Sequence, residues 1–494
     1  MKDEIARGAA WMVSFRVFDR SIGIISTMVL ARLLIPADFG LVAMAMSIIA
    51  IIELASNLSF ELALIQKAAP EREHFDTAWT LNILIALGGA CLTAALALPA
   101  AAFFGDPRLP AVMIAIAIAW FLSGFENTGI ANFRREMNFS AEFRWLAWRR
   151  VVSFVAVLLA AWFFRSYWAL VIGMAASRLT GVVMSYVMHP FRPRWSLSRA
   201  RDLFSFSRWM LANNVVDVVY SRLPHLFVGR IFSARTLGTY TVGSEISQLA
   251  NTELVAPINR AMFPGFARLV DDPETFRRVC IDATAAVLLI VLPVSLAVAV
   301  LAGPIVRVLL GEQWGQAVPI IHVLAFSGAI AALNANNNAA YLALGKPYLQ
   351  TVVLVVRLVA FCTIIGVLWP IRNLVNVAYA ELAAAAGSFA VSLPILFALL
   401  RLRLVAYVSS VWRPLVGSVL AGAATQSVIF LFAKPVTFIS ALMLLSTGLL
   451  VFALVYLLLI WLLWNLSGRK DTIEKQIALM IRDALVVALR RKAS

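Results

Sequence analysis

Charged residues are scarce in this sequence. Asp, Glu, Lys and Arg make up only 14% of its 494 residues, whereas a soluble globular protein carries about a quarter. Hydrophobic residues make up 62%, and apolar runs of about 20 residues, enough to cross a hydrocarbon core about 30 Å thick, recur from end to end. The composition excludes a soluble domain and indicates an all-α polytopic membrane protein, because a membrane barrel shows segments of about ten alternating residues.

Cysteine and histidine are also scarce, and enzyme motifs are missing. The three cysteines and four histidines lie far apart, so neither a disulfide framework nor a metal site is expected. Gly345-Lys346-Pro347 lacks the upstream glycine and the following hydroxyl residue of a phosphate-binding loop, and neither HExxH nor GxSxG occurs. We therefore expect no enzyme activity, no cofactor and no metal.

The first apolar run does not have the form of a cleavable signal. Arg16, Asp19 and Arg20 interrupt it, and no small-residue cleavage site follows. We expect a permanent helix here and about fourteen transmembrane helices in all. They cover roughly 10–34, 39–65, 76–103, 111–132, 150–164, 167–188, 209–231, 236–262, 281–302, 316–344, 349–369, 374–399, 414–433 and 437–465.

Lys and Arg gather on one side of the predicted membrane. The termini and alternate loops on that side hold 28 of the 42 Lys and Arg residues, the other loops hold 8, and the spans hold the rest. This asymmetry predicts that both termini are cytoplasmic. The net charge of +16 then follows from topology and from attraction to anionic lipids, so a nucleic-acid partner is not expected.

Two helical bundles of six spans each, followed by two extra spans, are expected. The predicted parts are an N-terminal bundle (1–190), an amphipathic cytoplasmic linker (191–208), a C-terminal bundle (209–402), spans 13 and 14 (403–468) and a cytoplasmic tail (469–494). The linker and the tail combine basic with apolar residues, which is typical of segments that lie on the inner leaflet. For the tail, a solvated helix packed on the cytoplasmic loops is the alternative.

An internal repeat supports the two bundles. An offset of 198 residues places Trp11-Met12 on Trp209-Met210, Asp19 on Asp217, Arg32 on Arg230 and Gly40 on Gly238. This offset spans six helices, an even number, so both halves enter the membrane in the same direction. Parallel repeats of this kind occur in transporters that bind substrate between two bundles.

Polar residues within the spans concentrate in spans 1, 2, 7 and 8. Such residues usually face a bundle interior or a water-filled cavity. We hypothesise that one set binds substrate in a central cavity, with the arginines directed at an anionic group, and that a second set couples a cation or balances charge. The first set is Arg16, Arg20, Asn57, Asn214, Arg222, Gln248, Asn251 and Arg260, and the second is Asp19, Glu53, Glu61, Asp217 and Glu245.

A structural interpretation of these residues stays open. Arg16, Asp19 and Arg20 could pair with one another near the cytoplasmic mouth, and Arg260 could extend to the membrane interface. Polar residues occur more sparsely in the other spans, at Glu126 and Asn127, Arg178, Asn334 to Asn338, Arg357 and Glu381.

The stretch from Ala31 to Gly40, ARLLIPADFG, separates spans 1 and 2. A cation at Arg32 suits the C-terminal end of the first helix, Pro36 stops that helix, and Asp38 is expected to be the N-cap of span 2. Under the offset, Thr236 is the corresponding cap. We predict a periplasmic hairpin that sets the angle between two cavity-lining helices, rather than direct substrate contact.

ARLLIPADFGLVAMA, followed by Glu61-Leu62-Ala63-Leu64-Ile65-Gln66, resembles the polysaccharide transport family of Wzx-like flippases, in the multidrug/oligosaccharidyl-lipid/polysaccharide exporter superfamily. The sequence departs from the family pattern at Phe60-Glu61, where a glycine is usual. The resemblance implies a transporter in the inner membrane of a Gram-negative bacterium. It would flip undecaprenyl-pyrophosphate-linked oligosaccharide units by alternating access, driven by a proton or sodium gradient, with succinoglycan as the expected polysaccharide.

Further partners and two other function classes remain in view. Membrane lipids, a glycan polymerase and export proteins are the expected partners. A multidrug or toxin cation antiporter of the same superfamily is the first alternative, although it would favour acidic and aromatic cavity residues over arginines. A non-transporting scaffold of a glycan synthesis complex is the second, and it would not need intramembrane charges on repeated faces. A polymerase is disfavoured because the predicted periplasmic loops are short.

Overall fold

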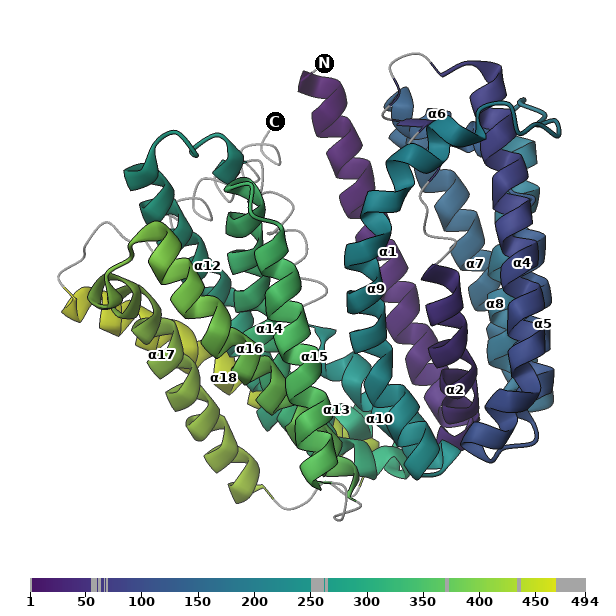
Figure 1. The fold of residues 1–494 in the computed structure, drawn as a ribbon. Coiled ribbons are helices and arrows are strands. Elements are labelled where there is room, and N and C mark those ends of the chain that lie inside the picture. Colours follow the sequence, from purple (N-terminus) through teal and green to yellow (C-terminus); the bar gives the residue numbers. More distant parts are fainter. Residues whose placement is uncertain are drawn as a thin grey trace, which may run out of the picture. The chain divides into compact units, whose positions relative to one another are not determined.

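The computed structural model describes residues 2–54, 60, 64–65, 67, 70–249, 262, 265–368, 373–432 and 437–467, and the backbone alone for 2–10, 13 and 204–214. All regular structure in these residues is helical (Figure 1), which confirms the all-α class. Two compact units divide the chain after Thr241, and Leu309–Gln313 join the first unit.

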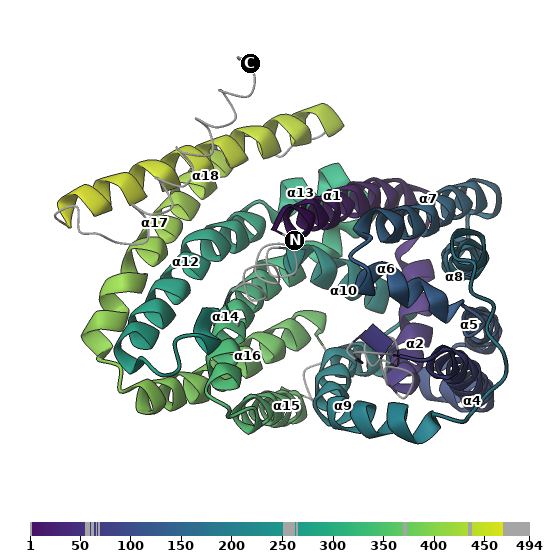
Figure 2. The same ribbon diagram turned by 90° about the horizontal axis from the view of Figure 1, so that it is seen from above.

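Unit 1 is built largely from helix pairs joined by short turns. α7 packs along α8, α4 packs along α5, and α9 lies beside α2 and α4 (Figures 1 and 2). Its elements are α1 (Lys2–Leu33), α2 (Pro36–Glu53), α4 (Arg72–Phe104), α5 (Leu109–Ser123), η2 (Thr128–Ile130), α6 (Ala131–Arg135), α7 (Phe139–Phe164), α8 (Trp168–Met188) and α9 (Ala200–Ile231). The helix α10 (Ala234–Ser247) begins in unit 1 and continues into unit 2.

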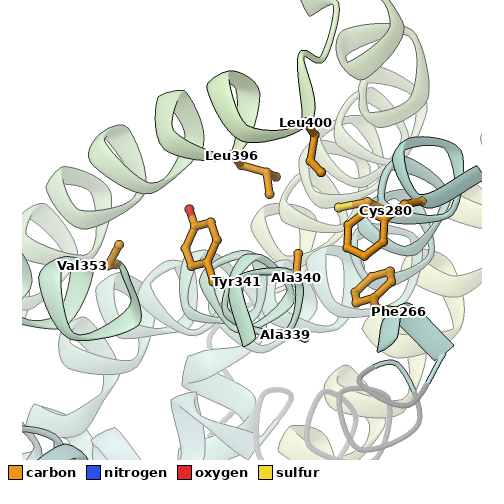
Figure 3. Close-up of a cluster of buried hydrophobic side chains, with 9 residues drawn as sticks. Phe266, Cys280, Ala339, Ala340, Tyr341, Val353, Leu396 and Leu400 are labelled. Carbon is orange, nitrogen blue, oxygen red and sulfur yellow. The ribbon is translucent and has the colours of Figure 1, made fainter. Parts of the chain in front are cut away.

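Unit 2 is organised around α14, which packs against α12 and α16, while α17 packs against α12 and α18 (Figure 2). Its elements are α12 (Pro273–Val300), α13 (Ala302–Leu309), η4 (Glu312–Ala317), α14 (Val318–Ala343), α15 (Tyr348–Leu368), α16 (Leu374–Leu400), α17 (Leu404–Leu431) and α18 (Phe438–Leu466). Figure 3 shows part of the core, in which Cys280, Tyr341, Leu396 and Leu400 join α12, α14 and α16.

Ten helices in the described residues are long and apolar enough to cross a membrane, or eleven if the bent pair of α5 with η2 and α6 counts as one. The multi-pass helical class is therefore confirmed, while the number fourteen stays a prediction. α1 and α9 are each 32 residues long but are not among the ten. Both carry charged residues within the helix, such as Asp19 and Arg222.

The predicted fourth span, 111–132, is broken in the structure. α5 ends at Ser123, and the next helical segment begins at Thr128 after a bend of 67°. Asn127 ends the break, because its Oδ1 accepts a hydrogen bond from the Gly129 N–H (2.9 Å) and so caps the following 3-10 helix. Glu126 and Asn127, which interrupt the apolar run, were the sequence signal for this break.

The turn between α1 and α2 is a tight helix hairpin. α2 begins at Pro36, and Asp38 is its third residue, so the prediction of Asp38 as N-cap was wrong. The Asp38 carboxylate instead accepts hydrogen bonds from the N–H groups of Ile35 and Tyr167, both at 3.1 Å. Thr236 likewise is the third residue of α10, and its hydroxyl lies 3.1 Å from that of Ser233. Asp38 and Thr236, related by the offset of 198, thus occupy the same position in their helices.

The two turns also meet each other, within unit 1. A Cβ atom added at Gly40 would lie 1.7 Å from the carbonyl oxygen of Ala234, and one added at Gly238 would lie 1.8 Å from that of Pro36. Pro36 and Ala234 are themselves 198 residues apart. The contact is therefore reciprocal, as in an isologous interface. We call these two glycines with their carbonyl partners the glycine crossing.

Residues 309–313 hold the same end of unit 1 together. The Gln313 Nε2 donates to the carbonyl oxygens of Ala31 (2.5 Å) and Leu34 (3.1 Å). These carbonyls belong to the end of α1, where helical partners run out. A side chain 279 residues further along the chain thus completes the hairpin that the sequence pattern placed between spans 1 and 2.

Candidate functional site

A half-buried ion pair joins α2 and α8 inside unit 1. The Arg178 Nη2 lies 2.5 Å from the Glu53 Oε1, and the two side chains are 18% and 26% exposed. Arg178 stands midway along α8, a helix apolar enough to span a membrane. Two charges at such a depth are costly unless they pair with each other or with polar cargo, so the pair marks the polar interior of this unit.

A second pair joins α1 and α7. The Arg150 Nε lies 2.9 Å from the Asp19 Oδ1, and its Nη2 donates to the Asp19 carbonyl oxygen (3.3 Å). Asp19 thus pairs with another helix, so an internal cluster of Arg16, Asp19 and Arg20 does not by itself describe its environment. Arg16 and Arg20 are half-buried on the same helix.

Glu126, beside the break after α5, faces a third arginine. The Arg149 Nη1 lies 3.7 Å from the Glu126 Oε2, and the guanidinium stacks over the Trp145 ring at 4.8 Å. The break therefore places a carboxylate next to α7, at Arg149, the residue directly before the arginine that pairs with α1.

The remaining predicted site residues divide into three groups. Arg222 on α9 is half-buried, and its Nε is buried without a hydrogen-bond partner. Asp217 and Glu245 are exposed, and Gln248 is half-buried. Asn57, Glu61, Asn251 and Arg260, with the side chain of Asn214, lie outside the described residues. The hypothesis that all these residues line one cavity stays a prediction.

Arg149 and Arg150 on α7 are the ion-pair partners that the sequence pattern did not reveal as residues of a helix. Arg149 and Arg150 count as cytoplasmic loop residues if the span begins at 150. α7 in fact begins at Phe139, where the Asn138 side chain caps it by accepting from the Ala141 N–H (3.2 Å). Asn at this position is a good N-cap, so the cap was the available signal for the earlier start.

Unit 2 has a buried network of amides and hydroxyls. Asn334 and Asn337 of α14 donate to Ser388 and Ser392 of α16 (3.1 and 3.0 Å), and Asn336 donates to Thr284 of α12 (2.6 Å). Interhelical hydrogen bonds of this kind help membrane helices to associate, because the hydrophobic effect does not drive association within lipid. Three asparagines of this run, Asn334, Asn336 and Asn337, are thus buried and bonded to neighbouring helices.

The hydroxyl groups fix how two of these amides point. Ser388 donates its proton to the Ala385 carbonyl (2.8 Å) and Thr284 donates to that of Cys280 (2.9 Å). Each hydroxyl oxygen must therefore accept from an amide N–H, which settles the amide orientation. The Oδ1 atoms of Asn334 and Asn336 are left buried without a hydrogen-bond partner, and each could accept a bond from a water or a hydroxylated ligand.

Among the described residues, no three His, Cys, Asp or Glu side chains come close enough together to hold a metal ion. Unit 1 instead offers arginine–carboxylate pairs between its helices, and unit 2 offers neutral amides. Guanidinium groups form strong charge-assisted hydrogen bonds with phosphate, while amides suit hydroxyl groups. The arrangement can bind charged or polar cargo.

Comparison with known proteins places the sequence among polysaccharide-related membrane proteins. Residues 29–319, more than half of the chain, match the family of polysaccharide biosynthesis proteins. The succinoglycan biosynthesis transport protein ExoT of Rhizobium meliloti is 24% identical over 66% of this chain and 66%, just under two thirds, of its own length. The lipopolysaccharide biosynthesis protein WzxC of Escherichia coli is 21% identical over 67% of this chain and 68% of its own.

Two solved structures have a similar fold. The lipid II flippase MurJ, in an inward closed conformation, superposes with a TM-score of 0.73 at 10% identity, over 92% of this chain and 99% of that one. An inward-facing multidrug resistance MATE family transporter of the MOP superfamily gives a TM-score of 0.62 at 15% identity, over 78% and 94%. At these identities the likeness establishes the fold alone, that of a polytopic helical membrane protein.

Proposed function

We infer the function from the premise that this chain belongs to the polysaccharide biosynthesis protein family. We propose that it moves undecaprenyl-pyrophosphate-linked oligosaccharide units across the bacterial inner membrane, from the cytoplasmic to the periplasmic leaflet. A succinoglycan repeat unit is the first substrate to test, since a succinoglycan transport protein is among the relatives. The lipid tail stays in the bilayer while the charged head group crosses through the protein.

The Arg178–Glu53 pair is the observation that carries this proposal. A pyrophosphate cannot enter hydrocarbon without partners, because desolvation of its charges is prohibitive. Arg178 can exchange the Glu53 carboxylate for a phosphate oxygen and form bonds of the same type. Glu53 then loses its counter-charge and takes up a proton or a sodium ion. Cargo entry and cation uptake are thereby linked through one pair, which accounts for the proposed coupling to an ion gradient.

The two alternative functions, a cation extruder and a scaffold, explain the half-buried Arg178–Glu53 pair less well. A cation extruder of the same superfamily shares the fold, but its cargo would compete with arginines for the carboxylates instead of replacing the carboxylates. A scaffold has no need for half-buried charges in a spanning helix, since such charges cost stability. Both remain outcomes of the experiment below.

The proposal is tested by deleting the gene and complementing it with variants. We expect the deletion to stop polysaccharide export and to leave complete lipid-linked units on the cytoplasmic leaflet. Arg178→Gln should reduce export about 10- to 100-fold, the equivalent of one charge-assisted hydrogen bond of about 1.5–3 kcal/mol. Glu53→Gln should retain cargo binding and lose the dependence on the ion gradient.

Arg199→Gln is the matched control. Arg199 also pairs with carboxylates, at 2.5 Å from Glu71 and 3.1 Å from Glu73, but lies at the surface outside the bundle. We expect its export to equal that of the wild type. Normal export by Arg178→Gln at normal protein levels would reject the exchange mechanism, and normal export by the deletion strain would reject the function itself.

A further inference from the structure

The segment from His189 to Arg199, which we call the strap, joins α8 to α9 without regular secondary structure and follows the start of α4. The backbone N–H groups of Arg194, Ser196 and Arg199 donate to side chains of Asp76 (2.9 Å), Thr80 (3.0 Å) and Thr77 (3.3 Å). All three acceptors are buried. A stretch without regular structure is thus held in one place by side chains of the helix beneath it.

The first residues of the strap are fixed as well. The Asn127 Nδ2 donates to the Phe191 carbonyl (2.7 Å), and the Arg72 Nη2 donates to that of Arg192 (3.0 Å). Burial lowers the pKa of His189 below its usual range, which keeps the ring neutral, and its Nδ1 accepts from the Phe191 N–H (3.1 Å). The strap therefore presents a defined outer surface.

That outer surface is apolar and cationic. Trp195 and Leu197 are 63% and 53% exposed. The rings of Trp195 and Trp79 pack edge to face, with their centroids 5.1 Å apart. Arg192 and Arg194 are exposed beside them, and Arg201, exposed at the start of α9, follows the strap directly and is counted with its surface. The nearby carboxylates are already engaged: Glu71 and Glu73 contact Arg199, and Asp202 lies 3.6 Å from Lys67. The strap thus carries net positive charge around an exposed tryptophan.

The length of α4 sets the depth of the strap. Residues 81–104 of α4 carry no charge and extend about 36 Å at 1.5 Å per residue, enough to cross a core about 30 Å thick. The turns before them, from Arg72 to Thr80, then stand at the level of the lipid head groups. Because Asp76, Thr77 and Thr80 hold the strap, it lies at that level too.

We propose that the strap is a binding surface for anionic phospholipid head groups, independently of what the protein transports. The guanidinium groups of Arg192, Arg194 and Arg201 receive the lipid phosphates, while Trp195 and Leu197 enter the interfacial layer beside them. Tryptophan prefers this layer, and clustered arginines bind anionic lipids there. By the charge asymmetry of the loops, the lipids belong to the cytoplasmic leaflet.

The test compares lipid binding by the purified full-length protein and two triple variants. The strap variant is Arg192→Gln/Arg194→Gln/Arg201→Gln. The control is Arg165→Gln/Arg230→Gln/Arg235→Gln, which removes the same charge from three exposed arginines outside the strap. Native mass spectrometry would measure binding of phosphatidylglycerol and of phosphatidylcholine to each protein.

We expect the wild type and the control to prefer phosphatidylglycerol, and the strap variant to bind it about 100-fold more weakly, as the loss of three such contacts implies. Equal melting temperatures in lipid-free detergent would show that both variants fold. Equal binding of the two lipids by the wild type, unchanged binding by the strap variant, or an equal loss in the control would each overturn the proposal.

Discussion

The hydrogen bond between Asn336 and Thr284, in the buried part of unit 2, has different consequences depending on which of the two side chains is removed. Thr284 accepts from Asn336 (2.6 Å) and donates to Cys280. If the threonine hydroxyl is removed, the amide loses its acceptor. If the amide is removed, the hydroxyl keeps its own bond to the Cys280 carbonyl, and an Oδ1 that had no hydrogen-bond partner disappears. The two sides of one hydrogen bond are therefore unequal.

We predict that Thr284→Val destabilises the protein by about 1–3 kcal/mol, because it strands a buried amide, whereas Asn336→Leu costs less than about 1 kcal/mol. Melting temperatures in detergent would show the order. The double variant should be more stable than Thr284→Val alone, since it removes the stranded group. A larger loss for Asn336→Leu than for Thr284→Val would contradict the assigned direction of the bond.

Sequence patterns locate polar residues at this scale but do not identify their partners. Asp19 and Glu53 stand out because carboxylates are rare in apolar runs, and the structure places both in ion pairs. Their partners, Arg150 and Arg178, lie more than 100 residues away, and nothing in local spacing connects them. Asn334 to Asn338 were visible for the same reason, but only packing reveals which hydroxyl each amide meets.

Among the helices, the glycine crossing depends on contact between two backbones. Both obstacles to a Cβ are carbonyl oxygens, within 1.8 Å of its position. A crowded side chain can rotate away, but a carbonyl held in a helix cannot. Any larger residue at either glycine therefore has to push α2 and α10 apart over several turns.

We predict that Gly40→Ala lowers the stability by at least the 1–3 kcal/mol typical of overpacking, although alanine favours helices. Gly88→Ala on α4 is the control, because a Cβ there meets no atom within 4 Å, and it should leave the melting temperature unchanged or raise it. The Gly40→Ala/Gly238→Ala double variant should lose less than the sum of the singles, since one separation makes room for both. Additive losses would refute a shared contact.

Helix positions were largely predictable from the sequence, whereas helix ends were less so. Long apolar runs correspond to α4, α12 and α14 to α18 because a membrane span needs such a run. The early start of α7 and the break after α5 depend instead on asparagine caps at Asn138 and Asn127. The linker 191–208, which overlaps the strap, was expected to be interfacial from its basic and aromatic residues, but the attachment of the strap to α4 required the structure.

At the scale of the whole molecule, the fold class follows from composition and repetition, and the comparisons agree with it. The orientation in the membrane stays a prediction from the loop charges. The three native cysteines make it testable, because Cys280 is buried while Cys91 and Cys362 are exposed on helices and can be replaced by serine. Single cysteines can then be introduced on this background.

We predict that Pro107→Cys, in the exposed turn between α4 and α5, reacts with a membrane-impermeant thiol reagent in intact cells. Ser198→Cys, in the strap, should react only after the inner membrane is opened. Both native residues are exposed, so the difference reports the side of the membrane and not local burial. Labelling of Ser198→Cys in intact cells would reverse the predicted orientation.

The glycine crossing also bears on the ancestry of the chain. Gly40 and Gly238 are 198 residues apart and contact each other reciprocally. The same geometry occurs between two identical subunits of a homodimer, but here both positions lie in one chain. A half-length ancestor would have placed a single glycine against its own copy, so one mutation would have struck the interface twice. If the chain arose by duplication and fusion of such a half, each glycine would now be encoded separately, while the contact still joins the two positions. In an alignment of many homologous sequences, substitutions at positions 40 and 238 should therefore occur together or not at all.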